Sequence, residues 1–308
     1  MSEGPSRDYH LKGSEGPADG VERIARERIE NALDEVRGAG SAAFAESVHE
    51  ARKDLKKVRS VLRLVRDELG EEVYRRENDR FRDAGRLLSG ARDAEVKLET
   101  IDILRDADDE MPTKATLRKY IYSLESERDE HSRAGAERRE LTERFEAELE
   151  AGRAALGDWS LDRDGWDLVG PGLARSYRRG RNRFGDVRED PNAENVHAWR
   201  KRVKDLWYHL RILKQAWPSV IGETADEAHE LADLLGDHHD LAVLAEDARG
   251  RPDRFDSAED LGALLGAAER RQEELLGEAL GLGARIYAEK PKAFAGRYES
   301  YWSAWRAG

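Results

Sequence analysis

The sequence predicts an all-α protein made of two four-helix bundles related by an internal repeat, and three observations support this. A basic motif with the same internal spacing occurs twice within 308 residues, about half a chain length apart, which indicates two similar lobes. Long segments place apolar residues at helical spacing, and no run of β-branched residues typical of a strand is present. Each half contains four such segments, which favours a four-helix bundle.

The repeated motif is His-x-x-Arg-Lys-x-x-Lys, followed by an Arg seven residues later. The first copy contains His49, Arg52, Lys53, Lys56 and Arg63. The second copy contains His197, Arg200, Lys201, Lys204 and Arg211. At about 100° per residue these five side chains share one helical face. The apolar residues of the first copy lie opposite, so the motif predicts a helix that packs on one side and leaves a basic face free.

Positive charge is concentrated in three segments of an acidic chain, whose net charge is −12. Residues 49–66 hold seven basic and two acidic residues, residues 197–214 hold six and one, and residues 175–183 hold five and none. A helix face that is merely solvated usually mixes the two signs. Segregated charge repels itself unless a partner uses it, so these segments favour the binding of an extended anion.

Composition narrows the class of protein further. The sequence has no cysteine, which excludes disulfides, thiolate metal sites and cysteine nucleophiles. No apolar run approaches the length of a membrane span, and residues 1–20 contain no hydrophobic signal segment. A cytoplasmic protein is therefore expected.

The first half of the chain is predicted to contain four helices after a disordered segment at residues 1–18. Helices are expected at about 19–36, from before residue 48 to about 70, at about 71–106 and at about 114–156. Gly, Pro and Trp at 157–172 indicate the boundary between lobes, which divides the chain into 19–157 and 158–308.

The second half repeats the pattern. A helix carrying Tyr177 comes first, the second basic helix begins near residue 193, and a helix with the sequence HELADLLGDHHDLAVL covers 229–244. A further helix is expected at about 257–287, and a tail with aromatic residues follows Pro291 and is expected to pack on the bundle.

These motifs resemble those of the conserved-histidine α-helical family, whose members are called CHAD domains. The resemblance rests on the two basic motifs, on YRREN…GRLLSGARDAEV after the first, on LLGDHHDLAVL after the second and on SYRRGR before the second. It covers about residues 20–290. It implies two four-helix bundles related by a pseudo-two-fold axis, with basic helices along a central groove or pore. It also implies binding of inorganic polyphosphate and association with polyphosphate granules and their proteins.

The predicted site is a set of phosphate-binding side chains, with no catalytic residue, no metal and no cofactor. Arg can bind two phosphate oxygens at once, and Lys supplies a point charge. The predicted residues are His49, Arg52, Lys53, Lys56, Arg59, Arg63, Arg66, Arg82, Arg86, Arg92, Arg178, Arg181, His197, Arg200, Lys201, Lys204, Arg211 and Lys214. In the second copy Trp207 stands where the first has Arg59, so the second basic face is weaker there.

Several histidines leave alternatives open. His49 and His197 are interpreted either as phosphate donors or as structural residues that link helices, with catalysis disfavoured. His229 and Asp233 stand four residues apart, as metal ligands can. However, His238 and His239 point to different sides of a helix, and the first lobe has Ala91 and Arg92 at the matching positions. Asp93 and Asp240 are expected to pair with Arg or to cap helices.

Three functions are compatible with these patterns. The sequence favours a non-catalytic polyphosphate-binding module. A metal-dependent hydrolase of polyphosphate or phosphate esters is the first alternative, and it would require carboxylates inside the basic groove. A nucleic-acid-binding protein is the second. It is disfavoured because aromatic residues are sparse in the basic segments and the acidic remainder would repel a duplex. No membrane partner is expected.

Overall fold

The computed structural model describes residues 8–38, 44–87, 92–107, 111–133 and 135–308, and every regular element in these ranges is helical. Eleven α-helices are described: α1 (Pro17–Gly38), α2 (Phe44–Leu64), α3 (Arg66–Leu87), α4 (Arg92–Ala107), α5 (Arg118–Arg133), α6 (Gly135–Ala155), α7 (Trp166–Glu189), α8 (Ala193–Leu213), α9 (Pro218–Arg249), α10 (Ala258–Ile286) and α11 (Pro291–Ala307). The all-α prediction is confirmed. Among the described residues no helix is both long enough and apolar enough to cross a bilayer.

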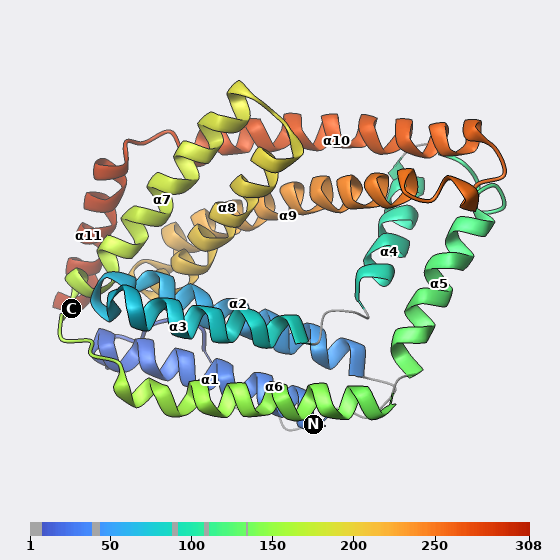
Figure 1. Cartoon of the computed structure of the whole chain (residues 1–308). Coiled ribbons are helices and arrows are strands. Elements are labelled where there is room, and N and C mark those ends of the chain that lie inside the picture. The colour runs from blue at the N-terminus through green and yellow to red at the C-terminus, as the bar shows by residue number, and fades with distance from the viewer. Residues whose placement is uncertain (1–7, 39–43, 88–91, 108–110, 134) are drawn as a thin grey trace.

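The helices form two sides joined at both ends (Figure 1). α1, α2, α3 and α6 lie together on one side, and α9 and α10 run along the other. α7, α8 and α11 connect the two sides at one end, and α4 and α5 connect them at the other. The two basic helices, α2 and α8, contact each other directly, so the repeated motif is brought to one region of the molecule.

Two hydrophobic clusters hold this arrangement together. The larger one contains buried residues of α1, α2, α3, α6, α7, α8 and α11, of the first half of α9 and of the end of α10. The smaller one joins α4 and α5 to the second half of α9 and to α10, with Tyr120 stacked on Phe255 at 5.0 Å between ring centroids. Each cluster therefore draws on residues from before and after position 157. The predicted lobe boundary at that position stays a prediction.

The apolar face predicted for the first basic helix is confirmed. Leu55, Val58 and Leu62 of α2 are each at most 2% exposed and belong to the larger cluster. In α8, Val196, Trp199 and Val203 are fully buried in the same cluster. Burial of one stripe on each helix orients the opposite stripe, which carries the Arg and Lys of the motif.

Two of the predicted helices each correspond to two helices in the structure. The helix expected at 71–106 is α3 and α4, and the helix expected at 114–156 is α5 and α6. Gly135 begins α6, and glycine disfavours a helix interior. The separation matters because α4 and α5 pack on α9 and α10, whereas α3 packs on α2 and α6, and α6 also packs on α1.

A single glycine interrupts α3 near its start. The basic helix was expected to continue to about residue 70, but α2 ends at Leu64 and α3 begins at Arg66. Gly70 has φ 75° and ψ 162°, a conformation that side-chain-bearing residues rarely adopt. This break redirects the chain, so that α3 packs on α2.

Gly172 lies where α7 passes closest to α2. A Cβ atom at this position would stand 1.9 Å from the carbonyl oxygen of Leu64. Residues 166–172 were expected to belong to the boundary segment, but they form the first part of α7. Gly172 shows that this part is tightly packed against α2.

Gly172→Ala is expected to lower the free energy of unfolding by about 3 kcal/mol, because a backbone atom must move to admit the methyl group. Gly185→Ala on the same helix is the matched control, since nothing lies within 4 Å of the Cβ it would gain. Its expected effect is neutral or stabilising by up to about 1 kcal/mol. Urea unfolding followed by circular dichroism compares the two, and equal stability of the two variants would contradict the packing described.

Candidate anion-binding groove

A groove of about 1250 Å³ lies between α2 and α9, bounded by α8, α4 and the segment before α1. Nine of its lining side chains are cationic: Arg52, Lys53, Lys56, Lys57, Lys97, Arg200, Lys204, Arg211 and Lys214. Five are acidic: Glu50, Asp93, Asp226, Asp233 and Asp240. The lining is thus positive overall in a chain of net charge −12.

The two copies of the motif contribute equivalent residues to this groove. Arg52 and Lys56 come from α2, and Arg200 and Lys204 occupy the same motif positions in α8. On each helix these two residues are one turn apart and lie opposite the buried stripe. The groove is therefore lined from two directions by the same pair of residue types.

Lys56 and Lys204 sit among other cations. Lys56 is exposed to the groove, yet burial by the surrounding protein and the charges of Lys204 and Arg52 lower its pKa to about 8. Burial, and then the charge of Arg200, also lower the pKa of Lys204. A bound anion would relieve this repulsion.

Arg200 has unused hydrogen-bonding capacity. Its Nε atom is buried, and no partner lies within hydrogen-bond reach in the described part of the chain. Its guanidinium lies against α9 at Gly236, where a Cβ would approach it to 3.2 Å. A buried donor without a partner is costly, and a phosphate oxygen is the kind of acceptor that could satisfy it.

Other cations of the groove are already partnered. Lys53 Nζ lies 2.5 Å from Glu50, and Lys57 Nζ lies 2.7 Å from Asp54. Lys97 pairs with Asp247. Arg211 stacks on Tyr9 and Trp207, at 5.3 Å from each ring centroid. These pairs fix the walls and reduce the charge available to a ligand.

The second half of the basic stripe of α2 does not line the groove. Arg59 donates to Asn78 on α3, and Arg63 pairs with the buried Asp205 at 3.3 Å. Arg66, the first residue of α3, pairs with Glu71 at 2.6 Å and lies over Tyr74, both in the same helix. The stripe of α2 passes from the groove to the contacts with α3, α7 and α8, where Arg59 and Arg63 serve packing between helices.

The predicted extensions of the site lie away from the groove. Arg82 and Arg86 pair with Asp79 and Asp83 on the solvent side of α3. Arg178 and Arg181 are exposed on α7, and Arg181 donates to the carbonyl of Tyr287 at 3.2 Å. Lys201 is also exposed and does not line the groove. The side chain of Arg92 lies outside the described residues.

The motif histidines have different surroundings. His49 lines the groove. His197 stacks on His239 with 4.2 Å between ring centroids, and its Nδ1 atom is buried without a partner in the described structure. Burial and the neighbouring His239 lower the pKa of His197 to about 4, so it is neutral at pH 7. His197 therefore links α8 to α9. His239 faces the groove, whereas His238 is buried.

The segment before α1 completes the groove, which sequence reasoning missed. Residues 8–16 were expected to be disordered, yet Tyr9 and Leu11 are 6% and 1% exposed. The Leu11 amide donates to the carbonyl of Ile212, and Tyr9 packs edge-on against Tyr208. Tyr9 and His10 both line the groove. Two large apolar side chains within a polar segment were the available signal.

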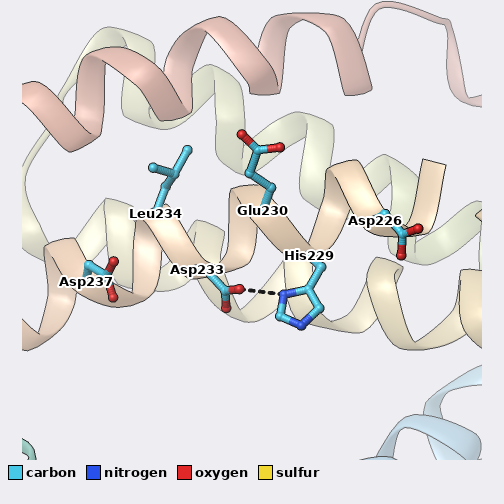
Figure 2. Close-up of a pocket in the computed structure, with 6 residues that line it drawn as sticks. All are labelled: Asp226, His229, Glu230, Asp233, Leu234 and Asp237. Atoms are coloured by element: carbon cyan, nitrogen blue, oxygen red, sulfur yellow. Dashed lines mark ion pairs between the residues drawn. The ribbon is translucent and has the colours of Figure 1, made fainter. Parts of the chain in front are cut away.

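An acidic surface adjoins the groove along α9 (Figure 2). Asp226, Glu230, Asp233 and Asp237 line a shallow pocket, in which His229 Nδ1 lies 2.6 Å from Asp233. In Figure 2 the other carboxylates point away from this pair. Among the described residues no group of three or more His, Asp or Glu side chains could hold a metal ion. Asp93 and Asp240, aligned in the sequence, both line the groove.

One buried serine–histidine pair is structural. Ser176 Oγ lies 2.9 Å from His209 Nδ1, and His209 Nε2 lies 3.0 Å from the carbonyl oxygen of Ser60. Since Nε2 donates to that carbonyl, Nδ1 accepts from the serine. Both residues are buried, so the pair joins α7, α8 and α2 rather than facing a substrate.

A family profile described as the CHAD domain matches residues 23–249, and the chain belongs to this family. A crystal structure of the CHAD domain from the plant Ricinus communis is similar, with a TM-score of 0.65 and 16% identity over 94% of this chain and 98% of that one. This likeness shows the shared fold.

Two curated relatives come from strains of Mycobacterium tuberculosis, and both are uncharacterized proteins. Each is 26% identical over 257 residues, which cover 76% of this chain and 46% of the relative. The chain thus spans about half the length of the curated relatives it matches.

Proposed function

We propose that this protein binds inorganic polyphosphate in the groove between α2 and α9, without catalysing a reaction on it. The observation that carries the proposal is that Lys56 and Lys204 line one groove together with further cations, and that the pKa of both lysines is lowered. An uncomplexed protein gains nothing from such crowding, whereas a polyanion converts the repulsion into binding free energy.

A polymer fits the groove better than a single phosphate group. The cations extend along α2 and α8 within a cavity of about 1250 Å³. Neutralising several phosphates releases condensed counterions, as in binding to nucleic-acid backbones. The proposal therefore centres on Arg52, Lys56, Arg200 and Lys204, with His49, Lys53, Arg211 and Lys214 as further wall residues.

The finer architecture belongs to the same proposal. Equivalent motif positions on α2 and α8 supply one groove, which supports a pseudo-two-fold relation between two four-helix bundles around a basic groove or pore. Polyphosphate granules and their proteins are the proposed cellular location and partners, within the cytoplasm.

The experiment is a titration with polyphosphate by isothermal calorimetry, repeated with single- and double-stranded DNA at equal salt. Binding of polyphosphate in preference to DNA supports the proposal, and preference for DNA would favour a nucleic-acid-binding protein. Release of phosphate in the presence of Mg²⁺ or Mn²⁺ would instead indicate a hydrolase, since Asp93, Asp233 and Asp240 share the groove with the cations.

The affinity is expected to fall as pH rises through 8. Below that pH Lys56 is already protonated in the free groove, so binding requires no proton uptake. Above it, the anion must draw a proton onto Lys56, which costs up to about tenfold in affinity per pH unit. Calorimetry between pH 7 and 9.5 in buffers of different ionisation enthalpy measures this uptake. In Lys56→Arg the side chain stays charged over this pH range, so the part of the pH dependence that comes from Lys56 should disappear. A pH profile identical to that of the unmodified protein would contradict the assignment of this dependence to Lys56.

A further inference from the structure

Lys56 differs from the lysines beside it on α2. Lys53 and Lys57 each form an ion pair with an acidic residue of the same helix. Lys56 forms no ion pair with any described residue, although it is exposed to the groove. Three lysines within five residues thus share a helix and a cavity but have different electrostatic surroundings, which makes them natural controls for one another.

The charged and titratable groups that line the groove with Lys56 come from several elements. α8 contributes Arg200 and Lys204, α9 contributes His239 and Asp240, and α4 contributes Asp93 and Lys97. The charges that act most strongly on Lys56 after burial are those of Lys204, Arg52, Arg200 and Lys53, which are all positive. These cations lower the pKa of the amine to about 8, and they are also the groups that would hold a phosphate next to it.

A lowered pKa next to phosphate-binding cations is what a nucleophilic lysine in a phosphate site requires. A lysine becomes nucleophilic when burial or a nearby cation keeps part of it neutral near pH 7. At pH 7.5 the neutral fraction of an amine with a pKa of about 8 exceeds that of an ordinary lysine by roughly two orders of magnitude. The groove also favours reagents that carry phosphate, because the same cations would bind such a reagent next to Lys56.

We propose that Lys56 is a site of acylation by acyl phosphates, and that this modification weakens the binding of polyphosphate. The neutral amine nitrogen attacks the carbonyl carbon of the acyl phosphate and forms an amide bond. The bond between that carbon and the phosphate oxygen breaks, phosphate leaves with the electron pair, and the proton lost by the amine balances the charge as hydrogen phosphate. The amide carries no positive charge, so the groove loses one cation.

The test uses the full chain and acetyl phosphate at pH 7.5, with acetylation of each lysine followed over time by peptide mass spectrometry. Lys56 is expected to react at least about tenfold faster than Lys57, and its rate should level off above pH 8. An excess of tripolyphosphate should slow the acetylation of Lys56. It should leave the acetylation rates of the exposed residues Lys119 and Lys290 unchanged. Acetic anhydride, which carries no phosphate, should favour Lys56 over Lys57 less strongly. Equal rates at Lys56 and Lys57, or no protection by tripolyphosphate, would overturn the proposal.

The inference rests on the proposed function, because the groove must accept phosphate groups, but the two can fail separately. Titration of unmodified protein tests polyphosphate binding alone. If polyphosphate binds and Lys56 is not acetylated preferentially, only the acylation proposal fails. If Lys56 is acetylated preferentially but polyphosphate does not bind, the proposed function fails. Lys56→Gln, which mimics the acetylated side chain, should lower polyphosphate affinity about tenfold. An undiminished affinity would overturn the regulatory consequence.

Discussion

Replacing Lys56 and Lys204 together by glutamate is expected to weaken polyphosphate binding by a factor of about 10² to 10⁴. Each lysine would contribute a charge-assisted contact worth about 1.5–3 kcal/mol, and 1.4 kcal/mol corresponds to a tenfold change in affinity. The two residues face one cavity from α2 and α8, so both contacts are lost from the same ligand. Calorimetric titration of the double variant measures the effect.

The matched control is the double variant Arg82→Glu/Arg86→Glu. It changes the net charge of the protein by the same amount, but both side chains lie on α3 outside the groove and already pair with aspartates. Its affinity is expected to fall by less than about threefold. Helical content and unfolding temperature establish that both variants fold. If the α3 variant loses as much affinity as the groove variant, the ligand is held by overall charge and the groove is not the site.

Raising the salt concentration from 50 to 200 mM should reduce the affinity for long-chain polyphosphate by a factor of a few hundred. If roughly six phosphates are neutralised, each with a coefficient of about 0.7 as for a single-stranded polyanion, the plot of log affinity against log salt has a slope of about −4. Fluorescence anisotropy of labelled polyphosphate at a series of salt concentrations gives this slope directly.

The groove variant provides the internal comparison for the salt series. Lys56→Ala/Lys204→Ala removes two cations, so its slope should be shallower by about 1.4. A slope near zero for the unmodified protein would mean that hydrogen bonds to a few fixed groups dominate, and the electrostatic mechanism would be wrong. A slope unchanged by the double substitution would show that these two lysines do not meet the polymer.

The basic faces could be predicted from sequence because helical periodicity is local. Leu55, Val58 and Leu62 define the buried stripe of α2, and this alone places Arg52 and Lys56 on the opposite side. The same reasoning places Arg200 and Lys204 on α8. Repetition of the motif then indicated a shared role, and the structure brings all four residues to one groove.

The distribution of the remaining arginines could not be predicted, because it depends on contacts between distant elements. Arg63 lies on the same stripe as Lys56, but Asp205 of α8 neutralises it. Tyr9 belongs to a segment without periodicity, and its contacts with Tyr208, Lys57 and Arg211 give it a fixed place. Periodicity reveals which face of a helix is free and says nothing about which partner covers each part of that face.

The docking of α5 onto the end of α9 has a consequence for synthesis on the ribosome. Tyr120 donates a hydrogen bond to Asp247, which lies 127 residues later in the chain. At about 5–20 residues per second, translation takes roughly 6 to 25 seconds to cover that distance. During this time the apolar side chains of α4 and α5 lack their partners on α9 and α10. The nascent chain therefore exposes a hydrophobic surface that chaperones could recognise before the C-terminal half covers it.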